Sequence, residues 1–122
     1  MAENDNYDRK ELIKMVSGIF DNEMSEEELN KRAELWYLAD HATDADTLAI
    51  LSKCPYVEVR EGVAASANTP ISLLIALSRD EDFQVRETVI LNRNTPQSVV
   101  DALENDENAF VREAVARRRK QK

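Results

Sequence analysis

Apolar residues recur along the second half of the chain with a period of 26 residues, the pattern of a repeat protein. Three Val-Arg-Glu triplets mark the period and begin at Val59, Val85 and Val111. Asn-Thr-Pro occurs twice in the same register, at 68–70 and 94–96. The apolar columns of this register are Leu48/Leu74/Val100, Leu51/Leu77/Leu103 and Val63/Val89/Val115. Agreement of so many positions predicts that each 26-residue segment is one structural unit.

Each unit is predicted to contain two short helices joined by an acidic loop. Thr69 and Thr95 are expected to cap the first helix, with the following prolines at its first position, where a missing N–H costs nothing. The loops at 80–82 and 106–108 lead into the second helix, whose apolar residues have i and i+4 spacing. These residues are Val85, Val89 and Ile90 in one unit and Val111, Val115 and Ala116 in the next.

The chain before residue 43 departs from the repeat and predicts an N-terminal helical cap. An amphipathic helix is expected from about Tyr7 to Phe20. Ser25 and Glu28 form a capping box at the start of a longer helix. The unit that follows is degenerate, with Thr43-Asp44 in place of Thr-Pro.

The predicted fold class is all-α. We expect a short right-handed α-solenoid of two-helix repeats, because stacked units bury apolar faces that one unit alone would expose. The handedness is taken from analogy with known helical arrays. The cap and the degenerate first unit cover 1–42, the repeats cover 43–118 and a basic tail covers 119–122, all within one structural domain.

Composition and charge argue against some classes of function, namely general nucleic-acid binding and membrane association. The chain has 122 residues, only 2 glycines and 3 prolines, and a net charge of −8. Residues 1–61 hold 15 acidic and 7 basic residues, whereas residues 62–122 hold 9 of each. An acidic body disfavours general phosphate binding. The absence of an apolar run of membrane length and of a secretory signal favours a cytoplasmic protein and excludes a membrane partner.

The repeat resembles the leucine-rich repeat variant family, within the wider HEAT-like helical arrays. The resemblance rests on residues 80–86, which read Asp-Glu-Asp-Phe-Gln-Val-Arg, and on the Asn-Thr-Pro that follows at 94–96. One member type of this family resembles an iron–sulfur protein with a cysteine-rich segment. This chain has only Cys54, so neither that cofactor nor a metal site is expected.

The arginines of the triplets are expected to be structural. In the helical arrays that the chain resembles, such an arginine pairs with the loop aspartate of its own or of the adjacent unit. Asp80 with Arg86 and Asp106 with Arg112 fit that account, six residues apart across the start of the second helix. Cys54 stands where the next pair would have its aspartate, which predicts a less constrained Arg60. Cys54 itself is expected to be a small buried residue, because no histidine is placed to activate its thiol.

The glutamates of the triplets form a second column, Glu61, Glu87 and Glu113. One interpretation is a solvated helix face. The other is an acidic stripe along the groove that binds a basic partner, since a charge repeated at fixed pitch suits an extended ligand.

Trp36 and Tyr37 lie next to His41 in the degenerate first unit. Burial at the junction with the cap is one explanation. Exposure would make either aromatic residue a good anchor for a partner. Together with Ile19 and Phe20 they also suggest a homodimer through the N-terminal helices.

The basic run Arg117-Arg118-Arg119-Lys120 is suited to the last turn of a helix, where cations interact favourably with the macrodipole. Contact with nucleic acid, with Arg93 contributing, is the alternative. No catalytic set of residues is recognisable, so the sequence predicts a protein that is not an enzyme. We therefore expect a protein-binding or scaffold module that uses the solenoid groove, with nucleic-acid association through the basic C-terminal turn as the alternative.

Overall fold

The computed structural model describes residues 9, 10, 12, 13 and 26–121 of the chain, and every regular element within them is α-helical. Residues 9, 10, 12 and 13 are helical, and most of the predicted N-terminal helix lies outside the described residues. The helices that follow are α2 (Glu26–His41), α3 (Ala45–Leu51), α4 (Val57–Ala65), α5 (Ile71–Leu77), α6 (Phe83–Leu91), α7 (Gln97–Asp101) and α8 (Ala109–Lys120). The prediction of an all-α fold is confirmed for this part of the chain. No helix in it is long and apolar enough to cross a membrane.

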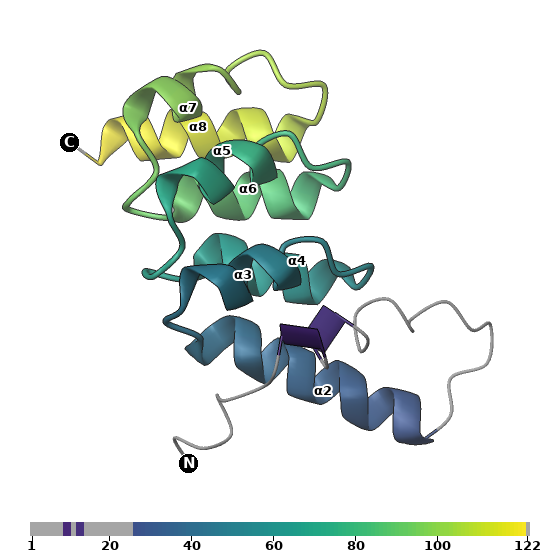
Figure 1. The fold of residues 1–122 in the computed structure, drawn as a ribbon. Helices are drawn as coiled ribbons and strands as arrows, with labels where there is room; N and C mark the ends of the chain where they lie inside the picture. The colour runs from purple at the N-terminus through teal and green to yellow at the C-terminus, as the bar shows by residue number, and fades with distance from the viewer. Residues whose placement is uncertain (1–8, 11, 14–25, 122) are drawn as a thin grey trace.

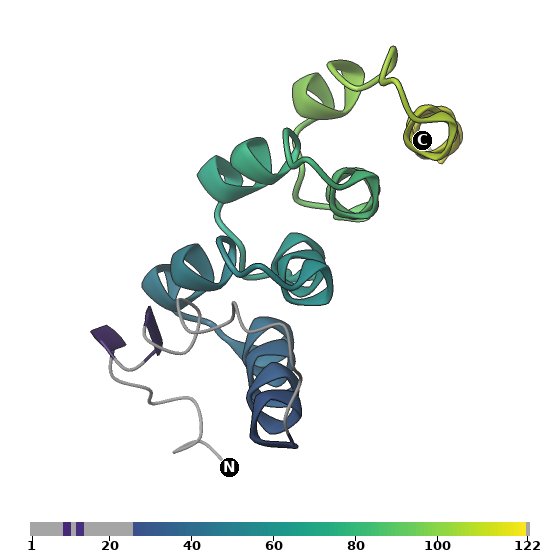
Figure 2. The ribbon, with the colours of Figure 1, turned by 90° about the vertical axis from the view of Figure 1, so that its right-hand side faces the viewer.

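The helices lie in two layers (Figures 1 and 2). Helices α2, α4, α6 and α8 follow one another in one layer and pack directly on their neighbours. The shorter helices α3, α5 and α7 form the other layer. Figure 2 shows that the stack bends, with α2, α4, α6 and α8 on the inner side of the bend. This layer therefore carries the inner surface of the molecule.

The apolar columns of the 26-residue register form the core. Burial removes their side chains from water and supplies the main favourable contribution to folding. The predicted columns are all buried: Leu48, Leu51, Val59, Val63, Leu74, Leu77, Val85, Val89, Val100, Leu103, Val111 and Val115. Ala116 was predicted to point inward and is exposed, whereas Ile90, its equivalent in α6, is fully buried. The difference arises because α8 covers α6, while no described residue covers this face of α8.

The helix starts differ from the prediction. Pro70 and Pro96, not the preceding threonines, are the N-cap residues of α5 and α7, with extended ψ angles of 152° and 148°. The hydroxyl of Thr69 donates instead to the carbonyl of Val63 at 2.6 Å, at the end of the preceding helix. Thr95 does the same to Val89 at 2.7 Å. Each buried threonine therefore satisfies a helix C-terminus, which leaves orphan carbonyls like any helix end.

Side-chain caps are found where the register has an acid or an amide. Asp44 is the N-cap of α3 and accepts from the Thr47 amide. Asp82 caps α6, and Asn108 caps α8 through the amides of Phe110 and Val111. The predicted capping box of Ser25 and Glu28 lies outside the residues whose side chains are described and stays a prediction.

Gly62 marks the closest approach between α2 and α4. A Cβ atom at this position would lie 2.8 Å from the Cβ of Ala39 on α2, closer than such atoms come in real structures. Glycine is therefore required here by packing rather than by backbone conformation, since no described residue has a positive φ.

Replacing Gly62 with alanine is expected to lower the free energy of unfolding by about 1–2 kcal/mol, because overpacking outweighs the better helix propensity of alanine. Chemical denaturation measures the change. In the double variant Ala39→Gly/Gly62→Ala, the space that the new methyl group needs is restored. This double variant should therefore be more stable than the single variant Ala39→Gly. A single Gly62→Ala variant as stable as the parent chain would show that α2 does not pack this closely.

Candidate interaction surfaces

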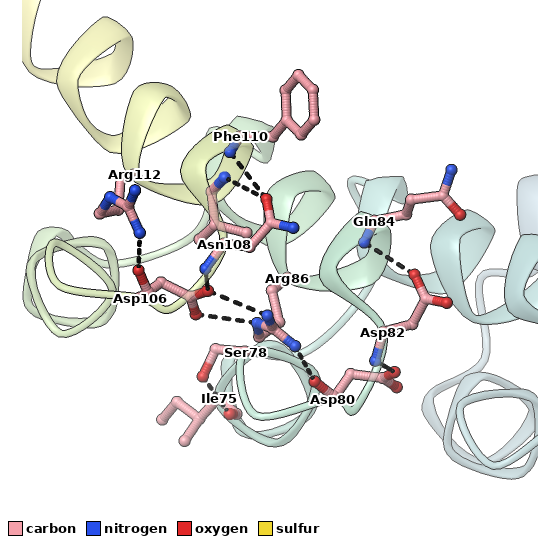
Figure 3. A network of polar contacts seen from close by, with 11 residues as sticks. Ile75, Ser78, Asp80, Asp82, Gln84, Arg86, Asp106, Asn108, Phe110 and Arg112 are labelled. Carbon is pink, nitrogen blue, oxygen red and sulfur yellow. Dashed lines mark hydrogen bonds and ion pairs between the residues drawn. The ribbon is translucent and has the colours of Figure 1, made fainter.

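Arg60 on α4 and Arg86 on α6 each bind an aspartate in the loop that precedes the next helix of the same layer. The guanidinium of Arg60 donates through Nε and Nη2 to both carboxylate oxygens of Asp80, at 2.9 and 3.2 Å. Arg86 binds Asp106 in the same way, at 2.9 and 3.0 Å (Figure 3). In both pairs each side chain is 12% exposed or less. Charged groups with so little water contact need an oppositely charged partner that also satisfies their hydrogen bonds. The planar guanidinium of arginine does so for a carboxylate through two parallel hydrogen bonds.

The two ion pairs named from the sequence are wrong, and the alternative of an aspartate from the adjacent segment is the one observed. Asp80 and Asp106 bind the arginine 20 residues earlier, and the arginine six residues later uses Nη1 to reach only their backbone carbonyls. Arg60, expected to be less constrained, has its ion pair with Asp80 and donates to the carbonyl of Cys54 as well. The spacing of six residues was right, but across it the main chain of the loop, not the carboxylate, is the acceptor.

A second set of contacts between units satisfies helix C-termini. The side-chain amide of Asn92 donates to the carbonyls of Ala64 and Ser66, at 2.8 and 3.0 Å. Arg118, 26 residues later, donates to the equivalent carbonyls of Ile90 and Asn92, at 2.6 and 2.8 Å, and also to that of Thr95. Arg118, a predicted contact for a partner, is thus engaged within the fold.

Arg117 and Arg119 of the basic run are also paired. Arg117 contacts Glu113 one helical turn earlier. Arg119 forms ion pairs with Asp101 and Glu104, at 2.8 and 2.7 Å. All of these side chains are more than 40% exposed, so the pairs are weak and open to competition by a partner. Helix α8 continues to Lys120, so Arg119 and Lys120 belong to the last helix.

Two of the three column glutamates lie in a crowded acidic region. Burial raises the pKa of Glu61, and the nearby charges of Asp82, Glu58 and Glu87 raise it further. We call these four residues the acidic cluster. They lie on α4, on α6 and at the N-cap of α6, in the layer on the inner side of the bend (Figure 2). Glu113, the third column residue, is not among the charges that act on Glu61 and is paired with Arg117.

Sequence reasoning missed Glu58 and Asp82. Glu58 lies one helical turn before Glu61, so helical spacing could have indicated it. Asp82 is the last residue of the loop that leads to α6, and its position as N-cap could have indicated it as well. Glu58 is partly neutralised by Arg32, which lies 26 residues earlier and also covers the ring of Tyr56.

Trp36 and Tyr37 are exposed, with 49% and 38% of their surface in contact with solvent. The explanation that they are buried at the cap junction is therefore wrong. The Tyr37 ring stacks on His41, with ring centroids 4.0 Å apart, and His41 Nδ1 lies 2.9 Å from the Tyr37 carbonyl oxygen. Both aromatic residues lie on α2, which packs directly on α4, one of the helices that carry the acidic cluster. Ile19 and Phe20, the other residues of the suggested dimer surface, lie outside the described residues.

Two hollows lie on the surface of the described residues, the first of them beside Asp82 of the acidic cluster. One, of about 450 Å³, adjoins Cys54, Arg60 and Asp80. Cys54 is buried as predicted, and burial raises the pKa of its thiol. The second hollow, of about 310 Å³, is lined by Leu91, Arg93, Arg117, Arg118 and Gln121. Within the described residues, no three histidine, cysteine, aspartate or glutamate side chains are grouped to hold a metal ion.

Comparison with known proteins gives no relative. No protein-family model, curated protein or solved structure matches the chain significantly.

Replacing Asp106 with asparagine is expected to lower the free energy of unfolding by about 3 kcal/mol at neutral pH, because it leaves the poorly exposed Arg86 without its counter-charge. Arg79→Gln, at an exposed arginine that does not contact Asp106, is the control and should cost under about 1 kcal/mol. Burial raises the pKa of Asp106, but the hydrogen bond from Arg86 and its charge outweigh burial and lower it.

This sign fixes the pH dependence of the Asp106 contribution. The contribution is complete above the ordinary aspartate pKa of 3.8 and is lost as the pH falls through the lower pKa of the folded state. Urea denaturation of the parent chain and of Asp106→Asn from pH 7 to pH 3 measures it. A stability gap that stays constant over this range would contradict the account.

Replacing Glu61 with glutamine is expected to raise stability at neutral pH, by less than about 1 kcal/mol, because it removes a partly buried charge and its repulsion by the acidic cluster. A carboxyl group with a raised pKa in the folded state destabilises the protein when ionised and does so less as the pH falls. The gain from Glu61→Gln should therefore shrink as the pH falls from 7 through the raised pKa, as measured by thermal unfolding. A lower melting temperature for Glu61→Gln at pH 7 would contradict this prediction.

Proposed function

We propose that this chain is a non-catalytic protein-binding module, built as a short right-handed α-solenoid of 26-residue units related to the leucine-rich repeat variant and HEAT-like arrays. The recurrence of the same contacts supports the repeat. The arginine–aspartate pair links residues 20 apart in two successive places, and the contacts to helix C-termini recur at separations of 26 and 28. A stack held in this way offers a rigid surface with a fixed pitch.

The binding face in this proposal is the inner layer of α4 and α6, and its partner is a basic segment of another protein. The observation that carries the proposal is the gathering of four acidic side chains on α4, on α6 and at the N-cap of α6, whose charges add to burial in raising the pKa of Glu61. A lysine- or arginine-bearing partner would remove that repulsion on binding, so complementarity of charge favours it.

Large apolar side chains are also exposed on helices of the inner layer. Leu91, at the end of α6, is 57% exposed, and Phe110, at the start of α8, is 60% exposed while stacking on Phe83. Large apolar side chains beside charged ones are typical anchors of an interface. Trp36 and Tyr37 on α2 could extend the surface in the direction of the N-terminus.

A role without covalent catalysis is supported by the environment of Cys54. Burial raises the pKa of its thiol, so the protonated form, which is a poor nucleophile, is favoured.

Nucleic-acid association through the basic C-terminal turn is the second candidate. The hollow lined by Arg93, Arg117 and Arg118 favours it, because it gathers three cations around a concave surface. Arg118, however, already donates to three carbonyls. Few cations are thus left for phosphates, and we rank this function below the first.

A synthetic peptide rich in lysine, arginine and leucine tests the first proposal. We expect saturable binding that weakens about tenfold in Glu87→Lys, where the charge of the acidic cluster is reversed at one position. Glu107→Lys makes the same charge change at an exposed residue outside the cluster and should bind nearly as well as the parent chain. Isothermal titration calorimetry at two salt concentrations measures both.

The same titration with a short DNA duplex separates the two candidates. Equal losses in Glu87→Lys and Glu107→Lys would reduce the peptide result to general electrostatic attraction and contradict the proposed face. Binding of the duplex, lost in Arg93→Gln/Arg117→Gln, would support the nucleic-acid function instead.

A further inference from the structure

The three arginines of the repeat are equivalent in sequence and differ in one respect. Arg60, Arg86 and Arg112 each donate through Nη1 to a loop carbonyl six residues earlier, those of Cys54, Asp80 and Asp106. Arg60 and Arg86 also bind a carboxylate through Nε and Nη2. For Arg112, no carboxylate among the described residues occupies that edge, although the Nη1 bond of 2.6 Å already orients the guanidinium (Figure 3).

The helix face around Arg112 is also equivalent to faces that are covered in the preceding units. On α6 this face consists of Phe83, Arg86 and Ile90, which pack on or bind residues of α7, α8 and the loop between them. On α8 the same positions are Ala109, Arg112 and Ala116, and all three are exposed. The spacing of three and four residues places them on one side of the helix.

We propose that this outer face of α8 is a docking surface for a helical hairpin of another polypeptide, which presents a loop aspartate to the open edge of Arg112. The chain itself shows twice what fits there. In both places the aspartate lies in a tight loop, where one oxygen also accepts the amide two residues on, and a helix follows. The exposed Arg112 and Lys120 give α8 the charge that suits an acidic loop.

The template also specifies a second contact. Asn92 and Arg118 each follow the loop aspartate of their unit by 12 residues and donate to the C-terminal carbonyls of the preceding second helix. The carbonyl of Ala116 is equivalent to those of Ala64 and Ile90, which accept these bonds. The docking hairpin is therefore expected to carry an asparagine or arginine at the end of its second helix. This surface and this acidic partner are separate from the acidic cluster and its basic partner.

A labelled peptide of residues 68–93 is a suitable probe, because it contains Asp80 and Asn92 in the required arrangement. Fluorescence anisotropy with the full chain should show binding that weakens about tenfold or more when the peptide carries Asp80→Asn. Arg112→Lys in the protein should cause a similar loss, because lysine keeps the charge but lacks the fork. Arg79→Lys, at another exposed arginine, should bind as the parent chain does. Binding that Asp80→Asn and Arg112→Lys leave unchanged would overturn the proposal.

A tandem chain decides the matter if the free peptide does not bind, since the peptide must fold as it docks. A second copy of residues 93–118 inserted after Arg118 places a duplicated Asp106 20 residues beyond Arg112, as in the two existing pairs. We expect this chain to melt at a clearly higher temperature than the same tandem chain carrying Arg112→Lys. Equal melting temperatures for the two tandem chains, with no binding of the peptide, would overturn the proposal.

Discussion

The bidentate pair between an arginine and an aspartate of the next unit is the interaction on which this arrangement depends. It fixes one loop and one helix of successive units at a single distance, and hydrophobic burial alone could not do so, because apolar contact is non-directional. The same guanidinium holds its own loop through a carbonyl, so each arginine joins three chain segments. With the asparagine, threonine and Arg118 contacts to helix C-termini, every buried side-chain nitrogen and oxygen of the described residues has a partner.

This stacking has consequences for the surface. The packing of α4 on α6 brings Glu61 and Glu87 near each other, although 26 residues separate them in the chain. The cost of that proximity is electrostatic repulsion, which the fold tolerates because the core and the arginine–aspartate pairs hold the helices in place. The arginine–aspartate pairs and the acidic cluster share no residue, so the proposed binding face is separate from the pairs that hold the helices together. Arg112 on α8 is intermediate between these two groups. It donates to a loop carbonyl as Arg60 and Arg86 do, but its side chain is exposed.

The sequence predicted the helical class and the core well, because the 26-residue register reports burial directly: Leu74, Val85 and Val100 occupy the interior that their columns indicated. The prediction of ion pairs failed where one aspartate has two arginines at suitable distances along the chain. Asp80 is six residues from Arg86 and 20 from Arg60, and only the fold shows that the distant residue receives the carboxylate. Thr69 is likewise of a residue type that is common at N-caps, yet its hydroxyl donates to a carbonyl at the end of the preceding helix. Of the candidate site, Glu61 and Glu87 were found from the register, but Glu58 and Asp82 belong to their surroundings only after α4 and α6 are packed.

The central claim is that the inner layer of α4 and α6 binds a basic segment of another protein. Backbone amide NMR spectra of the chain, recorded during titration with the basic leucine-containing peptide, test it most directly. The account predicts that chemical shift changes concentrate on residues of α4 and α6 around Glu61, Asp82 and Glu87, and that they saturate. Changes confined to α8, or spread evenly over every acidic residue of the chain, would contradict it.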